Sequence, residues 1–388
     1  MVEMLLLALI VAGWLYWLVA CWCTRSFFSG PELDDGFAPP ASILKPLCGV
    51  DTDAYENLAS FCQQDYPDYE ILCGVCDPAD PVIPIVRRLQ RDLPQIPVRL
   101  IVAATAGANR KAGILHVLTG EARHEILVIS DSDMRVTPDY LRRVVAPLAD
   151  EATGLVHCPY RGDRPVTFTA RLEAQHMTAT FLPSVMVAQR LLRGRLALGA
   201  TMALRRGDLE RLGGFAAFED YLADDYQLGL RMSDLGRRVL LSRYVVASVL
   251  GATSFREQWQ REVRWARTNR VNRPREYPGM LLTFSTPLSV ILVVASGLER
   301  AGWGALAVSV SLRWLVAWLV MGYAGDQATR KWLVWLPLRD MLSCLIWCVG
   351  GVGRRIVWRG QGYTILRGGR MQARAEEAVA RVERGMAD

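Results

Sequence analysis

Histidine is scarce in this chain of 388 residues, and its cysteines form no set of paired motifs. The nine cysteines include one C-x-x-C motif, Cys73 and Cys76, without the second motif or histidine pair that a zinc site needs. An odd number of thiols, several of them in apolar stretches, predicts inert cysteines in a reducing compartment. The four histidines are scattered and show no metal-ligand spacing: His116, His124, His157 and His176.

The chain also lacks the polarity of a disordered protein and the uniform apolarity of a membrane bundle. Hydrophobic residues make up 51% and charged residues 22% of it, and its mean hydropathy is +0.15. These values indicate a globular domain of roughly 200–250 residues attached to a few membrane segments. The net charge of +6 suits nucleic acid, anionic lipid headgroups or a diphosphate substrate. No basic stripe is interleaved with stacking aromatics, which argues against nucleic acid.

The N-terminal apolar run has no features of a cleaved signal peptide. Met4 to Cys23 runs 20 residues without a charge, which is long enough to cross about 30 Å of hydrocarbon. It lacks a basic n-region and a small-x-small cleavage site, so residues 1–24 are predicted to be a transmembrane anchor.

The C-terminal third holds the remaining apolar excess, and residues 279–353 are predicted to form two to three membrane segments. From residue 354 the tail carries eight arginines against four acids, which predicts a cytoplasmic location. An anchor plus three further crossings would separate this tail from the central domain, so one segment is predicted to be interfacial or re-entrant. The candidates are Met280–Leu298, interrupted by Pro287, and Trp332–Val352.

Three charged residues interrupt these segments. Arg313 lies within Ala301–Ala324, and Arg339 and Asp340 are adjacent within Trp332–Val352. They are consistent with snorkelling helix ends or an internal ion pair, and also with a headgroup or acceptor site at the membrane face.

The central domain, residues 25–278, alternates between short apolar runs and amphipathic stretches. This alternation predicts a mainly parallel sheet with helices on both faces, in which ligands bind beyond the carboxyl ends of the strands. The predicted strands are Ala41–Leu47, Tyr69–Val75, Val98–Ala103, Glu125–Ser130 and Gly154–Pro159, and the predicted helices are Tyr55–Gln64, Val82–Leu93, Lys111–Leu118 and Tyr140–Leu148.

Acids follow two of the predicted strands directly. Asp77 comes after Tyr69–Val75, and Asp131 and Asp133 form a D-x-D motif after Glu125–Ser130. Two adjacent carboxylates are costly without a compensating cation, and their hard oxygens suit Mg²⁺ or Mn²⁺ bridging a diphosphate. Such a triplet alone also occurs by chance or as a helix cap.

Two later motifs carry charge at helical spacing. Asp224 and Asp225 precede the amphipathic stretch Gln227–Leu235, where they favour either helix capping or a general base for a hydroxyl acceptor. Arg261 and Arg264 are three residues apart on one helix face, which suits a diphosphate leaving group or a solvated basic face.

Taken in order, these strings resemble the ceramide glucosyltransferase family of family 2-like glycosyltransferases, over roughly residues 40–270. The resemblance implies an α/β GT-A fold, a cytosolic catalytic domain, membrane segments at both ends, a UDP-sugar donor and inversion at the anomeric carbon. It implies Asp225 as catalytic base, Asp131 and Asp133 as ligands of Mg²⁺ or Mn²⁺, and a donor-binding set of Lys45, Pro46, Asp77, Lys111, Asp131, Arg261, Arg264 and Trp265. Besides the acids and arginines named above, the resemblance rests on the sequence strings Lys45–Asp51, Asn57-Leu58, Asp65-Tyr66-Pro67, Asp80-Pro81, Arg135-Val136, Gly154–His157 and Tyr226.

Some strings depart from the animal members of that family. Phe181-Leu182-Pro183-Ser184 stands where they carry a His-Pro, the D-x-D is fuller, and Trp358-Arg359-Gly360 lies in the tail. The string Phe181–Ser184, the string Leu222–Tyr226 and the tail string Trp358–Gly360 look closer to bacterial hopanoid-biosynthesis enzymes that add N-acetylglucosamine to bacteriohopanetetrol.

The predicted function is therefore transfer of one sugar, GlcNAc or Glc, to the hydroxyl of a membrane lipid in the bacterial inner membrane. A hopanoid is the favoured acceptor and ceramide the alternative. A processive polysaccharide synthase fits less well, because at most about three C-terminal spans are available for a channel. A catalytically dead scaffold fits less well, because Asp131 and Asp225 are both present.

Overall fold

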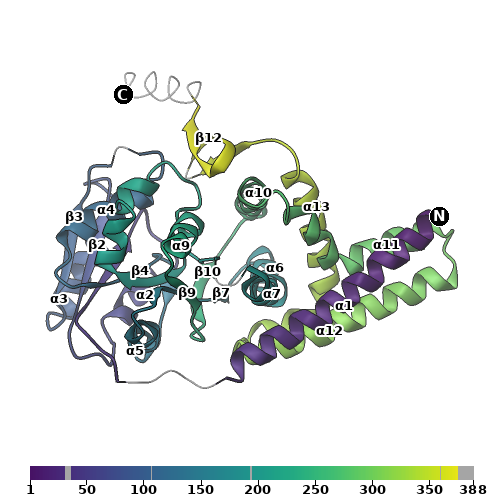
Figure 1. Ribbon diagram of the computed structural model, residues 1–388, viewed down its shortest axis with the longest axis horizontal. Coiled ribbons are helices and arrows are strands. Elements are labelled where there is room, and N and C mark those ends of the chain that lie inside the picture. Colours follow the sequence, from purple (N-terminus) through teal and green to yellow (C-terminus); the bar gives the residue numbers. More distant parts are fainter. Residues whose placement is uncertain (31–35, 106, 193–194, 359, 375–388) are drawn as a thin grey trace.

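The computed structural model describes residues 1–30, 36–105, 107–192, 195–358 and 360–374. An α/β body occupies one side of the molecule, and a bundle of apolar helices projects from the other (Figure 1).

A seven-stranded sheet forms the centre of the body, in the order β3-β2-β1-β4-β8-β6-β9. All its pairings are parallel except the two made by β8. β1, β2 and β4 are buried along their whole length, which is why they read as continuous apolar runs. The strands are β1 (Ala41–Pro46), β2 (Tyr69–Val75), β3 (Val98–Val102), β4 (Ile126–Ser130), β6 (Thr153–His157), β8 (Thr201–Arg205) and β9 (Arg238–Leu241).

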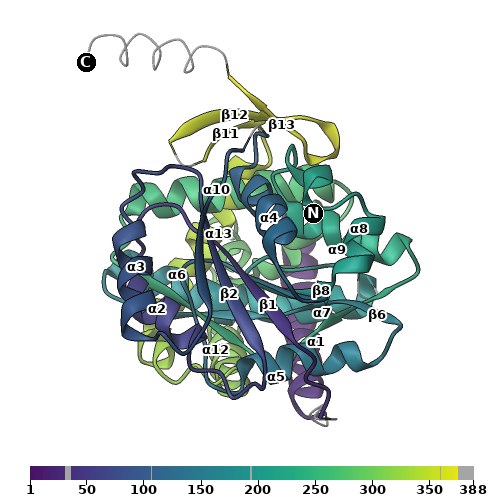
Figure 2. The same cartoon turned by 90° about the vertical axis from the view of Figure 1, so that its left-hand side faces the viewer.

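Helices cover both faces of this sheet (Figure 2). One core lies beneath α2, α3 and α5, and a second beneath α4, α8 and α9, so the predicted α/β class is confirmed. The covering helices are α2 (Ala54–Phe61), α3 (Ile83–Asp92), α5 (Tyr140–Val145) with η1 (Ala146–Ala149), α4 (Arg110–Glu121), α8 (Arg206–Arg211), η3 (Phe215–Phe218) and α9 (Asp224–Asp234).

A small second sheet, in the order β5-β10-β7, leads away from the end of β4. β7 (Tyr160–Pro165) pairs in parallel with β10 (Val246–Gly251), which pairs in antiparallel fashion with β5 (Met134–Arg135). No pattern in the sequence predicted this sheet. It joins the edge of the main sheet to α6 (Phe168–His176) and α10 (Phe255–Asn272), which begin just beyond β7 and β10.

The π-helical turn η2 (Met177–Phe181) links α6 to α7 (Leu182–Leu192). The string Phe181–Ser184 therefore lies where the turn passes into α7. Here the Tyr16 hydroxyl of α1 (Val2–Phe28) donates to Ser184 Oγ over 2.9 Å, and Trp17 packs beside Leu182. This stretch attaches the body to the N-terminal helix.

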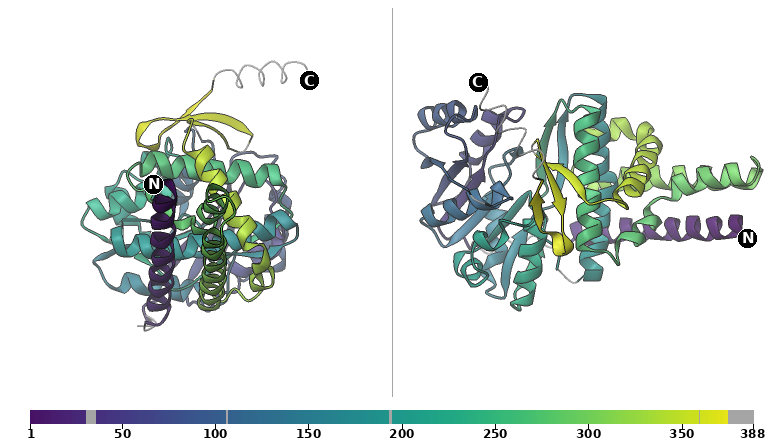
Figure 3. Two further views of the ribbon diagram at one scale, coloured as in Figure 1. Left: turned by 90° about the vertical axis from the view of Figure 1, so that its right-hand side faces the viewer. Right: turned by 90° about the horizontal axis from the view of Figure 1, so that it is seen from above.

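Within the part of the chain that the structure describes, three helices are long and apolar enough to cross a membrane: Val2–Phe28, Arg300–Tyr323 and Thr329–Gly350. A fourth, bent by 72°, joins η4 (Tyr277–Thr283) to α11 (Ser285–Ala295). α1, α11 and α12 (Arg300–Tyr323) lie side by side, whereas α13 (Leu336–Gly350), which follows η5 (Thr329–Trp335), crosses near the base of this bundle and packs on α10 (Figures 1 and 3). The predicted apolar segments therefore coincide with these helices.

The segment predicted as a basic tail contains a folded sheet. β11 (Arg355–Trp358), β12 (Gln361–Ile365) and β13 (Met371–Ala373) pair in antiparallel fashion, with η6 (Arg367–Gly369) before β13. Their apolar face packs on Leu222 of the body. Arg359 and residues 375–388 lie outside the described residues.

Candidate active site

The carboxyl ends of β1, β2 and β4 meet at one edge of the sheet, and the predicted acids lie there. Asp131 follows β4, and its amide donates to the Ala200 carbonyl over 3.1 Å. Asp77 follows β2, is exposed, and accepts from the Ala79 amide over 2.8 Å. Pro46 ends β1 between these two positions, opposite Gly74.

Two lysines converge on Asp131. Lys111 Nζ lies 2.5 Å from Asp131 Oδ1, and Lys45 Nζ donates to the Asp131 carbonyl over 2.5 Å. Lys45 is fully buried, with its ammonium 3.8 Å from the centre of the Phe61 ring, and burial lowers the pKa of this lysine to about 8. Burial is the largest single influence on the pKa of Lys111 and lowers it, but the combined effect of the Asp131, Asp224 and Asp225 charges and the hydrogen bond to Asp131 raises that pKa above its usual value.

Asp133 is the second carboxylate of the D-x-D motif. Its Oδ2 accepts from Ser248 Oγ of β10 over 2.8 Å. Burial, and then the neighbouring charge of Asp131, raise the pKa of Asp133 to about 6. Within the described ranges no three His, Cys, Asp or Glu side chains come together as a complete metal site. Two carboxylates nevertheless fit Mg²⁺ or Mn²⁺, since such ions are commonly held by one or two carboxylates together with substrate phosphates.

Asp224 and Asp225 open α9 on the same side of the sheet. Asn109, the N-cap of α4, donates to Asp224 Oδ1 over 3.2 Å and to the Tyr221 carbonyl over 2.8 Å. Burial, and then the charge of Asp224, raise the pKa of Asp225 to about 6. A carboxylate with a raised pKa suits a general base near neutral pH.

Gly199 lies beside both the Asp225 carboxylate and the Lys111 ammonium. Its carbonyl accepts from Lys111 Nζ over 3.3 Å, and a Cβ on Gly199 would lie only 2.9 Å from Asp225 Oδ2. The absence of a side chain therefore lets Asp225 approach the backbone beside Lys111. The fold thus gathers acids that lie far apart in the sequence.

Tyr160 lies among these acids and was not predicted. Burial raises its pKa, and the charges of Asp225, Asp131, Asp133 and Glu173 add to the increase, which places the phenol among them. No motif marks this residue; its only signal is its position three residues beyond the end of the buried strand β6.

Asp80 fixes the loop that follows Lys45 and Pro46. Its carboxylate accepts from the Gly49 amide over 3.0 and 3.1 Å and from the Val82 amide over 2.9 Å. Gly49 has a φ of +74°, which favours glycine there. This explains why the strings around Lys45 and Asp80-Pro81 occur together.

The R-x-x-R-W motif lies on α10. Arg261 is 2.5 Å from Glu173, a buried carboxylate of α6. Arg264 lies over the Trp358 ring of β11, 5.6 Å from its centre, and the adjacent Trp265 is half-buried. The first arginine thus contacts α6 and the second contacts the C-terminal sheet.

Arg339 and Asp340 form ion pairs with other helices and not with each other. Arg339 contacts both oxygens of Glu262 on α10, one of them over 2.9 Å. Asp340 receives Arg313 of α12 over 3.0 and 2.9 Å. All four side chains are buried, so the structure agrees with internal ion pairing and not with a site for a lipid headgroup.

Both cysteines of the C-x-x-C motif are free thiols, and Cys73 is buried within β2. His157 is also structural. Its Nδ1 accepts from the Leu198 amide over 3.2 Å, and burial lowers its pKa to about 3.

A mostly parallel sheet with lysines and carboxylates gathered at its carboxyl edge is typical of a GT-A-like glycosyltransferase. The sequence model of Glycosyl transferase family 21 matches residues 5–371, and the chain belongs to this family. It is therefore an enzyme of the glycosyltransferase class, and the expected relationship to ceramide glucosyltransferases is confirmed at the family level.

Two curated relatives and one solved structure illustrate the similarity. Ceramide glucosyltransferase 1 of Caenorhabditis elegans is 24% identical over 355 residues, covering 87% of this chain and 74% of that protein. Beta-monoglucosyldiacylglycerol synthase of Synechocystis is 26% identical over 211 residues, covering 53% and 42%. The mannosyltransferase PcManGT from Pyrobaculum calidifontis, solved with GDP-Man and Mn²⁺, has a TM-score of 0.52 and 21% identity, covering 90% of this chain and 99% of that one, and it supports the fold.

Proposed function

We propose that this enzyme is a membrane-bound inverting glycosyltransferase that moves one GlcNAc or Glc from a UDP-sugar to the hydroxyl of a membrane lipid. The observation that carries the proposal is the cluster of Asp131, Lys111 and Asp225 in a body attached to apolar helices. The string Phe181–Ser184 favours a hopanoid such as bacteriohopanetetrol as acceptor. The Caenorhabditis relative, named a ceramide glucosyltransferase, favours ceramide as the alternative.

The donor would bind at the carboxyl edge of the sheet. Asp77 and Pro46 lie where they could contact the nucleotide, and Asp131 and Asp133 would hold Mg²⁺ or Mn²⁺ against the diphosphate. When bound, the ion would neutralise charge that develops on the leaving UDP. Lys111 and Lys45 place further positive charge beside Asp131. The Pyrobaculum neighbour, whose complex contains GDP-Man and Mn²⁺, supports such a donor site.

Asp225 would act as the base. As the acceptor oxygen forms its bond to the anomeric carbon, its proton passes to the Asp225 carboxylate and the bond from that carbon to the diphosphate oxygen breaks. Attack from the face opposite the leaving group inverts the anomeric centre. Arg261 and Arg264, three residues apart on α10 and followed by Trp265, would lie by the leaving group and the acceptor.

The arrangement of the helices supports one topology. The end of α1 and the end of α12 lie on the side of the body, whereas the N-terminus and the turn at residues 296–300 lie at the far end of the bundle (Figures 1 and 3). We place three crossings at α1, at the bent segment Tyr277–Ala295 and at α12, with α13 along the interface. The catalytic domain and residues 354–374 then share the cytoplasmic side of a bacterial inner membrane.

Product analysis tests the function. Membranes containing the enzyme are incubated with radiolabelled UDP-GlcNAc or UDP-Glc and with bacteriohopanetetrol or ceramide, and the extracted lipids are identified by mass spectrometry. We expect a single added sugar, loss of product with EDTA, and recovery with Mg²⁺ or Mn²⁺. A ladder of long chains would instead indicate a polysaccharide synthase, and turnover unaffected by EDTA would remove the metal role of Asp131 and Asp133.

A further inference from the structure

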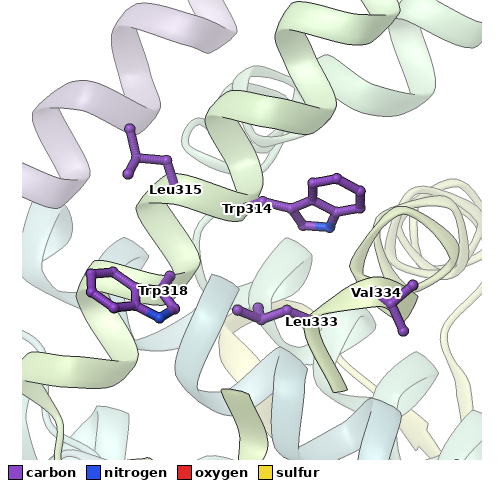
Figure 4. A pocket seen from close by; sticks show the side chains of 5 residues that line it. All are labelled: Trp314, Leu315, Trp318, Leu333 and Val334. Atoms are coloured by element: carbon purple, nitrogen blue, oxygen red, sulfur yellow. The ribbon is translucent and has the colours of Figure 1, made fainter. Parts of the chain in front are cut away.

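An apolar groove lies between α12 and η5, on the outside of the helix bundle. It has a volume of about 410 Å³ (Figure 4). A second groove of about 380 Å³ follows the same helix further from the body. Leu315 lines both, so the two form one continuous surface, which we call the α12 track. The first groove is lined by Trp314, Leu315, Trp318, Leu333 and Val334, and the second by Ala307, Val308, Ser311, Leu312 and Leu315.

The length of the α12 track matches one leaflet of a bilayer. Its residues on α12 run from Ala307 to Trp318, and at 1.5 Å per residue this span is about 16 Å. One half of a hydrocarbon core that is about 30 Å thick is about 15 Å. α12 is itself long and apolar enough to cross a membrane. The track therefore has the depth of a single acyl chain that starts at the end of the helix nearer the body.

Two cations lie at that end of the track. The Arg330 guanidinium lies over the Trp318 ring, 4.4 Å from its centre, and donates to the Trp318 carbonyl over 2.8 Å. Lys331 is the next residue and is exposed. Among the residues that the structure describes, neither cation is ion-paired with a carboxylate. The neighbouring acid Asp326 is buried, where it accepts from Thr178 Oγ1 and from the Thr329 amide.

We propose that the α12 track binds one anionic phospholipid, with its phosphate at Arg330 and Lys331 and one acyl chain along α12. A basic pair at the interface attracts an anionic headgroup, and the apolar lining with two tryptophans accommodates the chain. This lipid is distinct from the sugar acceptor, which is an uncharged alcohol in the proposed reaction. The site is also separate from the acids at the carboxyl edge of the sheet, since all the residues that line the track belong to α12 and η5.

Native mass spectrometry of the full chain in a neutral detergent tests this site. Phosphatidylglycerol and phosphatidylcholine with identical acyl chains are titrated, and thermal unfolding is followed in parallel. We expect one tightly retained phosphatidylglycerol that raises Tm, and weaker binding of phosphatidylcholine. The double variant R330Q/K331Q should lose at least tenfold in affinity for phosphatidylglycerol. Lys331→Gln alone, at an exposed side chain that leaves the fold unaltered, should lose several-fold.

Two further variants distinguish the contribution of the basic pair to lipid binding from the contribution of the apolar α12 track. Arg300→Gln removes one positive charge, as Lys331→Gln does, but at the opposite end of α12, and should bind phosphatidylglycerol as the wild type does. Leu315→Asn places an amide in both grooves and should weaken binding although both cations remain. Equal affinity of R330Q/K331Q and wild type, equal binding of the two phospholipids, or an equal rise in Tm with glycerol phosphate alone would each overturn the proposal. None of these measurements depends on transferase activity.

Discussion

At the scale of single residues, Asp131 is the residue that both lysines of the site contact. The chain contains only three lysines, and two of them, Lys45 and Lys111, bond to this one residue. An ammonium group is a compact point charge that fits a narrow buried position, whereas a guanidinium needs room for a planar fork. This explains lysine at these two positions in a chain whose other basic residues, apart from Lys331, are arginines.

Asp225 gives the first prediction. Asp225→Asn removes the proton acceptor and keeps the shape of the side chain, so kcat should fall by about 10²–10⁴-fold. The Kd for UDP-sugar, measured by calorimetry, should change little. Asp234→Asn at the other end of α9 is the matched control, since Asp234 is an exposed partner of Arg195. Wild-type kcat in Asp225→Asn would contradict the role of base.

The pH profile gives a second prediction. A base must be unprotonated to act, and the pKa of Asp225 is raised to about 6 from the usual value near 4. We therefore expect kcat/KM to fall tenfold per pH unit below about 6 and to level off above it. Asp133 has a similarly raised pKa. If the acid limb moved with the concentration of Mg²⁺, the limb would belong to the metal site and not to Asp225.

Several site residues could be predicted from the sequence because each follows a recognisable element. Asp131 and Asp133 come directly after a buried strand, and Asp225 opens an amphipathic helix. Tyr160 could not be predicted, because its place among the acids depends on β7 pairing with β10, which lies far along the chain. The ion pair between Arg261 and Glu173 likewise could not be predicted, because it depends on the packing of α10 against α6.

At the scale of elements, β1, β2 and β4 were predictable because burial on both faces makes them apolar throughout. Their order and the reversed β8 between β4 and β6 were not. A short strand such as Thr201–Arg205 has the same composition in either direction, so only its pairing with Ile126–Ser130 fixes its orientation.

The pair formed by Arg339 and Glu262 gives a third prediction. It joins α13 to Glu262, one of the two residues between the arginines of the R-x-x-R-W motif, and both side chains of the pair are buried. Arg339→Ala leaves an unpaired buried carboxylate, which costs about 3–5 kcal/mol. We expect a clear fall in Tm in detergent and loss of activity. The double variant R339M/E262L should recover much of the Tm, and the exposed Arg354→Ala is the control; a Tm near wild type in Arg339→Ala would contradict this.

The C-terminal sheet gives a fourth prediction. The Leu222 amide donates to the Gly369 carbonyl over 3.1 Å, and the Met371 amide to the Asp220 carbonyl over 2.7 Å, so the sheet holds the loop before Asp225. Ile365 is fully buried against this loop. Ile365→Ala should lower the local stability of the C-terminal sheet by about 2–5 kcal/mol. It should lower kcat by a larger factor than it raises KM. Hydrogen exchange at residues 220–225 should rise, whereas Val357→Ala, on the exposed side of the same sheet, should leave the exchange and kcat unchanged.

At the scale of the whole molecule, the helices divide into a projecting bundle and one helix at its base. α13 contacts α10 and α6 of the body, although η5 and α13 together, Thr329–Gly350, are long and apolar enough to cross a membrane. Hydropathy alone cannot distinguish these cases, because a helix along an interface and one across a membrane can have the same composition. The position of α13 is set by the body on which it packs and by two buried ion pairs of α13, Arg339 with Glu262 and Asp340 with Arg313.

The proposed topology gives a fifth prediction. Glu299→Cys at the turn between α11 and α12 should react with a membrane-impermeant maleimide on intact spheroplasts, whereas Arg91→Cys on α3 should react only after permeabilisation. Both variants are made with Cys48 and Cys348 replaced by serine, and that background without an added cysteine is the control. Labelling of both positions from the same side would contradict three crossings.

The hydrogen bonds between the C-terminal sheet and the loop of residues 220–222 have a consequence for the order of synthesis. A ribosome makes the chain from its N-terminus, so residues 355–373 emerge after every apolar helix. The loop that precedes Asp225 therefore receives its final backbone partners only after α1, α11, α12 and α13 have been made. Assembly of the site thus follows the synthesis of these apolar helices, and a chain halted before residue 355 contains the acids but lacks the sheet that holds the loop before Asp225.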